Sequence, residues 1–182
     1  KDVMSEKVVL LLHIRMPDTR KVIEELSDDE GVVGEEGPFP DAPVEGECVD
    51  VAKRDKLMEE CATNPTLENL SACLACGGAA ASTLCKRAQL LLKAQRPRAA
   101  ALDASAALAL NPDSARAYKI RGRARRLAGD YEGAAADFGQ AQRIDFDPDV
   151  RPDLVYCSTR AAKIRAIKLA EEHNAALDAA KA

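Results

Sequence analysis

Six basic side chains stand between Ser114 and Arg126, and their spacing could bind an anionic partner. Four of them, Arg116, Lys119, Arg123 and Arg126, recur at intervals of three or four residues, which places them along one side of a helix. Cationic groups gathered on one surface attract acidic partners and repel basic ones. This segment is therefore the strongest candidate for a binding function.

Three interpretations of the basic run are open at this point. The first is a docking surface for an acidic protein, and the second is an ordinary solvated helix face, which is what most charge runs are. The third is nucleic-acid binding. The formal net charge of the 182-residue chain is -4 and its aromatic content is 3%. A nucleic-acid binder usually has a basic excess and stacking aromatics, so we expect no nucleic-acid partner.

Other reactive residue types do not form a recognisable site. Cys73 and Cys76 form one C-x-x-C pair, but a structural zinc site needs four ligands and no second pair follows at a suitable spacing. His13 and His173 lie near opposite ends of the chain. We predict no catalytic residues, no enzyme activity, no metal and no cofactor; a redox or metal protein built on the C-x-x-C pair stays a third class to test.

The six cysteines and the apolar segments indicate the compartment. Without a recognisable secretory signal, the cysteines are predicted to be buried helix thiols in a reducing, cytoplasmic environment. The run from Val8 to Leu12 is much shorter than the roughly 20 apolar residues that span a membrane, so we expect no membrane association.

The basic segment belongs to a repeat of 34 residues. Residues 81–114 align on 115–148, and identical pairs include Arg87 with Arg121 and Asp103 with Asp137. Counted from the first residue of each unit, positions 8, 20 and 27 are small in both: Ala88, Ala100, Ala107 and Gly122, Ala134, Ala141. This period and these small residues are typical of the tetratricopeptide repeat, in which two antiparallel helices cross closely at those positions.

Helix boundary residues agree with the repeat. Ser114 can cap a helix that starts at Ala115, Gly129 can end it, and Asp130 can cap the next. Pro97 falls in a first helical turn, where proline is tolerated.

The flanking segments complete an all-α helical solenoid. Residues 47–80 are predicted to be a degenerate repeat, and 149–182 a C-terminal capping helix. Residues 27–46 are an acidic linker within a stretch, Val22 to Asp50, that has eleven acidic residues and no lysine or arginine. The role of residues 1–26 is not readable from the sequence.

The repeat register assigns roles to the charged side chains. Positions 2, 5, 9 and 12 of a first helix line the groove of such a solenoid, so the four cations above form one basic wall. Gln89 and Lys93, from the preceding repeat, are expected to join it. Arg87 and Arg121 occupy position 7, which is normally leucine. A buried guanidinium there needs a carboxylate, and we predict structural pairs with Asp103 and Asp137.

These residues resemble a known family. The string KRAQLLLKAQRPRAAALDASAALALNPDSARAYKIRGRARRLAGDYEGAAADF, followed by IDFDPD, is similar to the tetratricopeptide domain of the Hsc70-interacting (Hip) family of co-chaperones. The shared features are arginine at position 7 of both repeats, the KAQRP turn and the DFDPD exit.

The resemblance implies a function. It implies a non-enzymatic module whose repeats bind the ATPase domain of a 70-kDa heat-shock chaperone and stabilise its ADP-bound state. Clamping of the chaperone's acidic tail is not expected, because position 6 is Lys86 and Ile120. A homodimer through regions without a recognisable pattern stays open. The alternative is a tetratricopeptide scaffold in a larger assembly with no link to chaperones.

Overall fold

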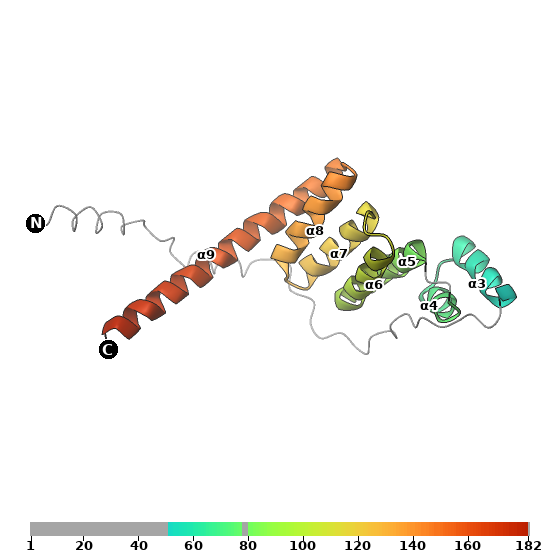
Figure 1. The fold of residues 1–182 in the computed structure, drawn as a ribbon, viewed down its shortest axis with the longest axis horizontal. Helices are drawn as coiled ribbons and strands as arrows, with labels where there is room; N and C mark the ends of the chain where they lie inside the picture. The colour runs from blue at the N-terminus through green and yellow to red at the C-terminus, as the bar shows by residue number, and fades with distance from the viewer. Residues whose placement is uncertain (1–50, 78–79, 182) are drawn as a thin grey trace, which may run out of the picture. The chain divides into compact units, whose positions relative to one another are not determined.

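The computed structural model describes residues 51–77 and 80–181 (Figure 1). These residues form seven α-helices and one short 3-10 helix, and no strand occurs among them. The predicted acidic linker, 27–46, and the N-terminal segment, 1–26, lie outside the described residues. The described residues fall into two units: the repeats, in 51–77 and 80–158, and residues 159–181, which continue the last helix.

Two helical hairpins form the centre of the repeat unit. They are α5 (Ala81–Lys93) with α6 (Pro97–Leu110), and α7 (Ala115–Leu127) with α8 (Tyr131–Ile144). α6 packs on both α5 and α7, and α5 also contacts α7, so the first helices of successive repeats stand side by side (Figure 1). This nesting of hairpins is a tetratricopeptide solenoid, which confirms the predicted all-α fold class.

Small residues allow the helices to approach closely. Five alanines at repeat positions 8, 20 and 27 are fully buried: Ala88, Ala100, Ala107, Ala134 and Ala141. At Gly122, the sixth position of this set, an added Cβ would lie 2.9 Å from Cε1 of Phe138, whose ring is itself fully buried. Glycine fits at this position and a larger residue does not, because the Phe138 ring occupies the space that a methyl group would need.

Side-chain caps and left-handed residues set the helix boundaries. Ser114 Oγ accepts a hydrogen bond from Ala117 N, and an Asp130 carboxylate oxygen accepts one from Gly133 N. Gly129, with φ 82°, follows α7 in the left-handed conformation that ends many helices. The equivalent residue after α5 is Gln95, which adopts φ 57° despite its side chain.

The first repeat is shorter than the 34-residue period predicts. α3 (Val51–Thr63) and α4 (Leu67–Ala75) lie within the degenerate unit predicted over residues 47–80. α3 ends and α4 begins 30 residues before the matching boundaries of α5 and α6. The second helix of this repeat has 9 residues where α6 has 14. Gly77, with φ 76°, follows α4 in the left-handed conformation that ends helices. α4 is therefore shorter than α6 by more than one helical turn.

The 30-residue offset also explains the blurred pattern of the first repeat. At this offset Leu57 and Cys73 occupy the places of Arg87 and Asp103. They belong to a small apolar cluster with Cys61 and Leu70. The first repeat therefore has an apolar contact where the second has an ion pair.

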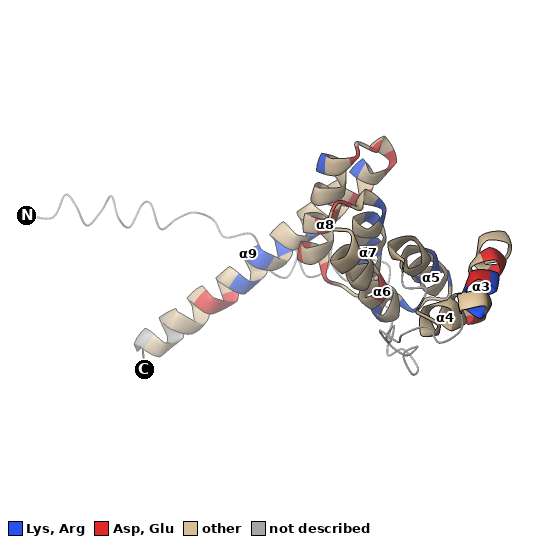
Figure 2. Cartoon of the chain, turned by 45° about the vertical axis from the view of Figure 1, so that its right-hand side comes forward, with Lys and Arg blue, Asp and Glu red and all other residues tan. Residues whose placement is uncertain are grey.

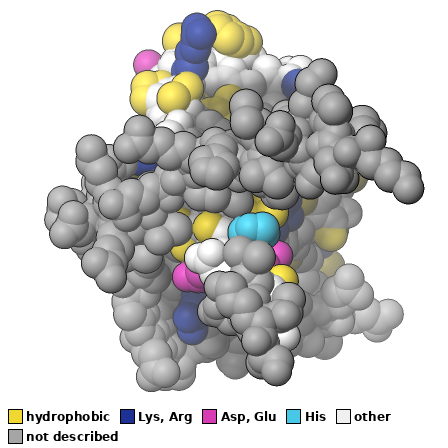
Figure 3. All heavy atoms as spheres, turned by 90° about the vertical axis from the view of Figure 1, so that its left-hand side faces the viewer, with side chains coloured by type: hydrophobic (Ala, Val, Ile, Leu, Met, Phe, Trp, Pro, Cys, Tyr) yellow, Lys and Arg dark blue, Asp and Glu magenta, His cyan; other side chains and the backbone are white. Residues whose placement is uncertain are grey.

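The C-terminal helix begins by covering the last repeat. η1 (Pro148–Val150) leads into α9 (Arg151–Lys181), and Val150 and Cys157 are fully buried in a cluster with Ala134 and Phe138. The remainder of α9 exposes Glu171, Glu172 and His173 among others, and the described side chains visible in Figure 3 are of mixed chemical type. None of the described helices has the length and apolar character that crossing a membrane requires.

Candidate protein-binding groove

One buried ion pair and one partly buried ion pair hold the repeat hairpins together. Arg87 donates from Nε and Nη2 to the two carboxylate oxygens of Asp103, both at 2.6 Å, and the two side chains are 3% and 4% exposed. Arg121 binds Asp137 in the same two-pronged way, at 2.9 and 2.6 Å. In each case the arginine lies on the first helix of a repeat and the aspartate on the second. These are the pairs that the sequence indicated, and the two parallel hydrogen bonds in each pair fix the orientation of the guanidinium.

Each pair has a further hydroxyl partner from the preceding repeat. Arg87 Nη1 lies 3.3 Å from Ser71 Oγ, and Arg121 Nη1 lies 3.5 Å from Ser105 Oγ. The arginine thus connects three successive helices at the same place in both repeats. This arrangement fixes α5 and α7 relative to each other and so positions the groove between them.

A cavity of about 430 Å³ lies between α5 and α7. Its lining residues are Gln89, Leu92 and Lys93 from α5 and Ile120 and Arg123 from α7. Leu92 and Ile120 supply apolar surface, whereas Lys93 and Arg123 supply positive charge. The Arg123 side chain is 50% exposed, so its guanidinium is accessible to a partner.

Arg116 extends the basic wall toward the start of α7. Its Nη2 donates to Gln89 Oε1 at 2.8 Å, which bridges α7 and α5 at the edge of the cavity. Four of the six predicted partner-binding residues, Gln89, Lys93, Arg116 and Arg123, therefore gather around one hollow. In Figure 2 the ribbon carries basic positions along α7 and acidic positions in the segment that follows α8.

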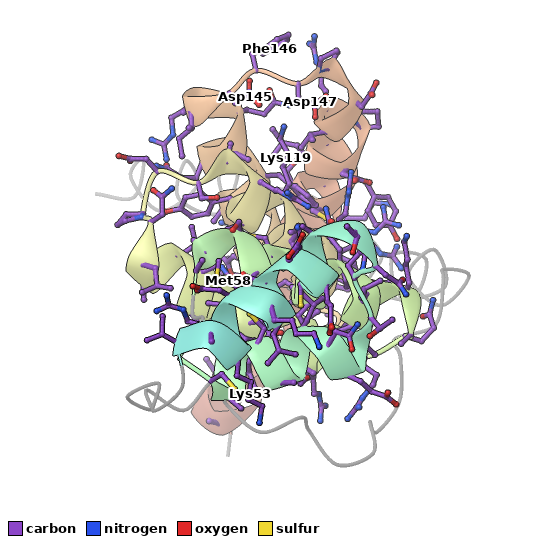
Figure 4. All side chains as sticks on the ribbon, turned by 90° about the vertical axis from the view of Figure 1, so that its right-hand side faces the viewer. Lys53, Met58, Lys119, Asp145, Phe146 and Asp147 are labelled. Carbon is purple, nitrogen blue, oxygen red and sulfur yellow. The ribbon has the colours of Figure 1, made fainter. Side chains whose placement is uncertain are left out.

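Lys119 is already occupied by acidic side chains of the chain itself. Its Nζ lies 2.9 Å from Asp147 Oδ2 and 3.3 Å from Asp145 Oδ2, and the side chain is only 17% exposed (Figure 4). The hydrogen bond to Asp147 raises the pKa of the Lys119 ammonium, and the same bond lowers the pKa of the Asp147 carboxyl. An incoming carboxylate would have to displace one of these partners.

Arg126 and Arg123 also meet an acid of the same chain. Arg126 Nη1 binds Asp153 Oδ1 at 2.7 Å and its guanidinium carbon lies 5.4 Å from the centre of the Tyr156 ring. Arg123 Nε lies 3.8 Å from the other Asp153 oxygen, which is a loose contact. Arg126 therefore ties α7 to α9, whereas Arg123 keeps much of its exposure.

Sequence reasoning missed the internal acids that divide this basic wall. Asp145 and Asp147 pair with Lys119 in the first half of α7, and Asp153 pairs with Arg126 in its last turn. Leu92 and Ile120 add an apolar floor to the cavity. The signal was present in the DFDPD exit, whose first acids lie in the same 34-residue unit as the basic helix α7. Their pairing with Lys119 could not be read from spacing alone, because it depends on how the exit turn folds back.

The cysteines of the described segments are consistent with packing groups. Cys61, Cys73, Cys85 and Cys157 are buried free thiols and Cys76 is half-buried. Burial raises the pKa of Cys73 and Cys85, and that of Cys157 to about 11, which keeps the reactive thiolate scarce. Within residues 51–77 and 80–181, no three His, Cys, Asp or Glu side chains gather as a metal site would require.

Comparisons with known proteins agree with the repeat and its resemblance. The chain is 46% identical over 87 residues to Hsc70-interacting protein 1 of Drosophila melanogaster, covering 48% of this chain and 23% of that protein. It is 38% identical over 121 residues to the 58 kDa phosphoprotein of Plasmodium berghei, covering 66% and 27%. The chain thus spans about a quarter of the length of the curated relatives it matches.

One solved structure is similar to part of this chain. It is the second TPR domain of the human RPAP3 protein in complex with HSP70 peptide, with a TM-score of 0.49 and 23% identity over 58% of this chain and 89% of that one. No protein-family model matches. In sequence, the chain is therefore similar to part of the Hsc70-interacting proteins.

Proposed function

We propose that the groove between α5 and α7 binds the ATPase domain of a 70-kDa heat-shock chaperone and stabilises its ADP-bound state. The observation that carries the proposal is the cavity shared by α5 and α7, with Lys93, Arg123 and the Arg116–Gln89 bridge around an apolar floor. Similarity to the Hsc70-interacting proteins supports the choice of partner. The protein acts by binding, in the cytoplasm, and not by catalysis.

The six candidate residues have three different roles in this proposal. Lys93, Arg116 and Arg123 contact acidic side chains of the partner, and Gln89 holds Arg116 in place. Lys119 and Arg126, whose charges are satisfied internally, shape the groove by fixing the exit turn and α9. A groove that combines positive charge with an apolar floor selects an acidic surface that also offers an apolar side chain.

Stabilisation of the ADP state follows from linkage. A protein that binds one state of a two-state partner more tightly than the other shifts the equilibrium by its differential affinity. A tenfold preference for the ADP state corresponds to about 1.4 kcal/mol. Bound protein then slows nucleotide release, because release requires the state to which it binds weakly.

The proposal is tested by binding of the whole chain to an isolated ATPase domain with ADP and with ATP, measured by calorimetry. Preferential binding of the ADP form is expected. Equal binding to both forms removes the nucleotide-state mechanism, and absence of binding to either form favours a tetratricopeptide scaffold with another partner.

A further inference from the structure

Phe146 is an exposed aromatic residue at the end of the repeats. It stands between α8 and η1 and is 72% exposed, whereas Phe138, within α8, is fully buried. In Figure 4 its side chain points away from the helices, beyond Lys119. Leu110 and Ile144, which close α6 and α8 at equivalent repeat positions, are also exposed. Each of these three apolar residues is therefore exposed at or just after the end of a repeat's second helix.

The turn that carries Phe146 is firmly held. Lys119 binds the aspartates on both sides of it. Gln142 accepts a hydrogen bond from Asp147 N at 3.1 Å and donates to Asp147 O. Asp147 in turn accepts from Asp149 N at 3.0 Å. The backbone around the aromatic ring is thus fixed on both sides although the ring itself packs on little.

The fold does not need an aromatic residue at this place. The equivalent residue at the end of the preceding repeat is Pro112, in a turn where Asn111 Oδ1 accepts from Asp113 N. The repeat can therefore be closed by a turn with proline in the place of Phe146. An exposed phenylalanine on a braced turn costs apolar exposure without a packing gain in the isolated chain.

We propose that Phe146 is a docking anchor that inserts into an apolar socket bordered by basic side chains on the chaperone ATPase domain. The proposal rests on the proposed function for the identity of the partner. The basic border follows from charge: Asp145, 66% exposed, and Asp149, also exposed, flank the ring. A rigidly presented aromatic side chain is typical of the few residues that carry most of an interface's binding energy.

The groove carries positive charge and the Phe146 turn carries negative charge. The groove presents Lys93, Arg116 and Arg123, whereas the turn presents Asp145 and Asp149. Lys119 connects the two, because it lies on α7 and binds the turn. Opposite charges at two ends of one interface fix the orientation of a partner, since the reversed arrangement would place like charges together. Because the turn is already ordered, little conformational freedom is lost on binding.

The anchor is tested with Phe146→Ala in the whole chain, against the ATPase domain with ADP. Leu102→Ala is the matched control, because Leu102 is 62% exposed on α6. We expect Phe146→Ala to weaken binding about tenfold or more with an unchanged melting temperature, and Leu102→Ala to change binding less than about twofold. If Phe146→Ala binds the ATPase domain as tightly as the wild-type chain does, Phe146 is not an anchor, and the proposed function still stands.

A second variant tests the basic border of the socket. Asp149→Lys should slow association, and the effect should shrink as salt is added, because screening weakens exposed charges. An association rate that does not change, or that rises, contradicts a basic border. If the wild-type chain binds no ATPase domain at all, the proposed function fails and the assignment of this partner to Phe146 fails with it.

Discussion

Two helical glycines should respond to alanine with opposite signs. At Gly122, in α7, an added Cβ would lie 2.9 to 3.0 Å from three carbons of the Phe138 ring. That ring is fully buried against Val150 and Cys157, so it has little room to move. At Gly139, in α8, nothing among the described residues lies within 4 Å of an added Cβ. The two sites therefore differ in packing while sharing a helical backbone.

The magnitude follows from two opposing effects. Replacing glycine by alanine inside a helix stabilises by about 0.5–1 kcal/mol, because the unfolded chain loses conformational freedom. Gly139→Ala should show this gain. Forcing a methyl group into a filled core costs about 1–3 kcal/mol. Gly122→Ala should therefore be destabilised overall, and the unfolding free energies of the two variants should differ by about 1–3 kcal/mol.

Urea unfolding of the whole chain, followed by circular dichroism at 222 nm, measures the difference. Both variants keep the net charge and add one methyl group, so each serves as the other's control. If Gly122→Ala is as stable as Gly139→Ala, the close crossing of α7 and α8 at Phe138 is not as described, and the repeat register that depends on it is wrong.

Four further variants test other parts of the structure. Arg87→Met should destabilise by about 3–5 kcal/mol, since it leaves the Asp103 carboxylate buried and uncompensated, whereas adding Asp103→Leu should restore most of that loss in the same urea assay; equal stability of Arg87→Met and wild type would contradict the buried pair. Gln95→Gly should raise the unfolding free energy by about 1 kcal/mol, because it relieves a left-handed backbone, and a loss would show that its side chain stabilises the turn. The Asp147 pKa is lowered in the folded chain by Lys119, so the stabilisation that this pair provides is present above the unfolded aspartate pKa and lost as pH falls through the folded one. Lys119→Met should raise the Asp147 pKa toward its ordinary value in an NMR titration, and an unmoved pKa would mean that the ion pair does not form.

The sequence was informative where the chain repeats itself. Residues 81–148 carry the period, the small residues and the caps, so the hairpins α5/α6 and α7/α8 could be predicted nearly to the residue. The first repeat was less tractable because it lost residues. A period of 34 cannot align a unit whose second helix ends at Ala75, and the correct offset of 30 emerges only once both helices are seen.

The sequence predicted which residues surround the groove, but not which of their charges are neutralised by acids of the same chain. Arg116, Gln89, Lys93 and Arg123 lie where the repeat register places them, because a helix position determines a direction. The pairing of Lys119 with two aspartates depends on a turn outside the helices, and the conformation of a turn cannot be read from a repeating pattern of residues. The buried arginines were easier, since a guanidinium at an apolar position demands a carboxylate nearby.

The central claim is that the positive groove between α5 and α7 docks an acidic surface of the chaperone ATPase domain. The most direct measurement is the dissociation constant, with ADP, of the double charge reversal Lys93→Glu with Arg123→Glu, compared with the single reversal Lys56→Glu at an exposed site on α3. The account predicts that the double variant binds at least about tenfold more weakly while its circular dichroism is unchanged, and that Lys56→Glu binds nearly as wild type. Equal affinity of the double variant and wild type would contradict it.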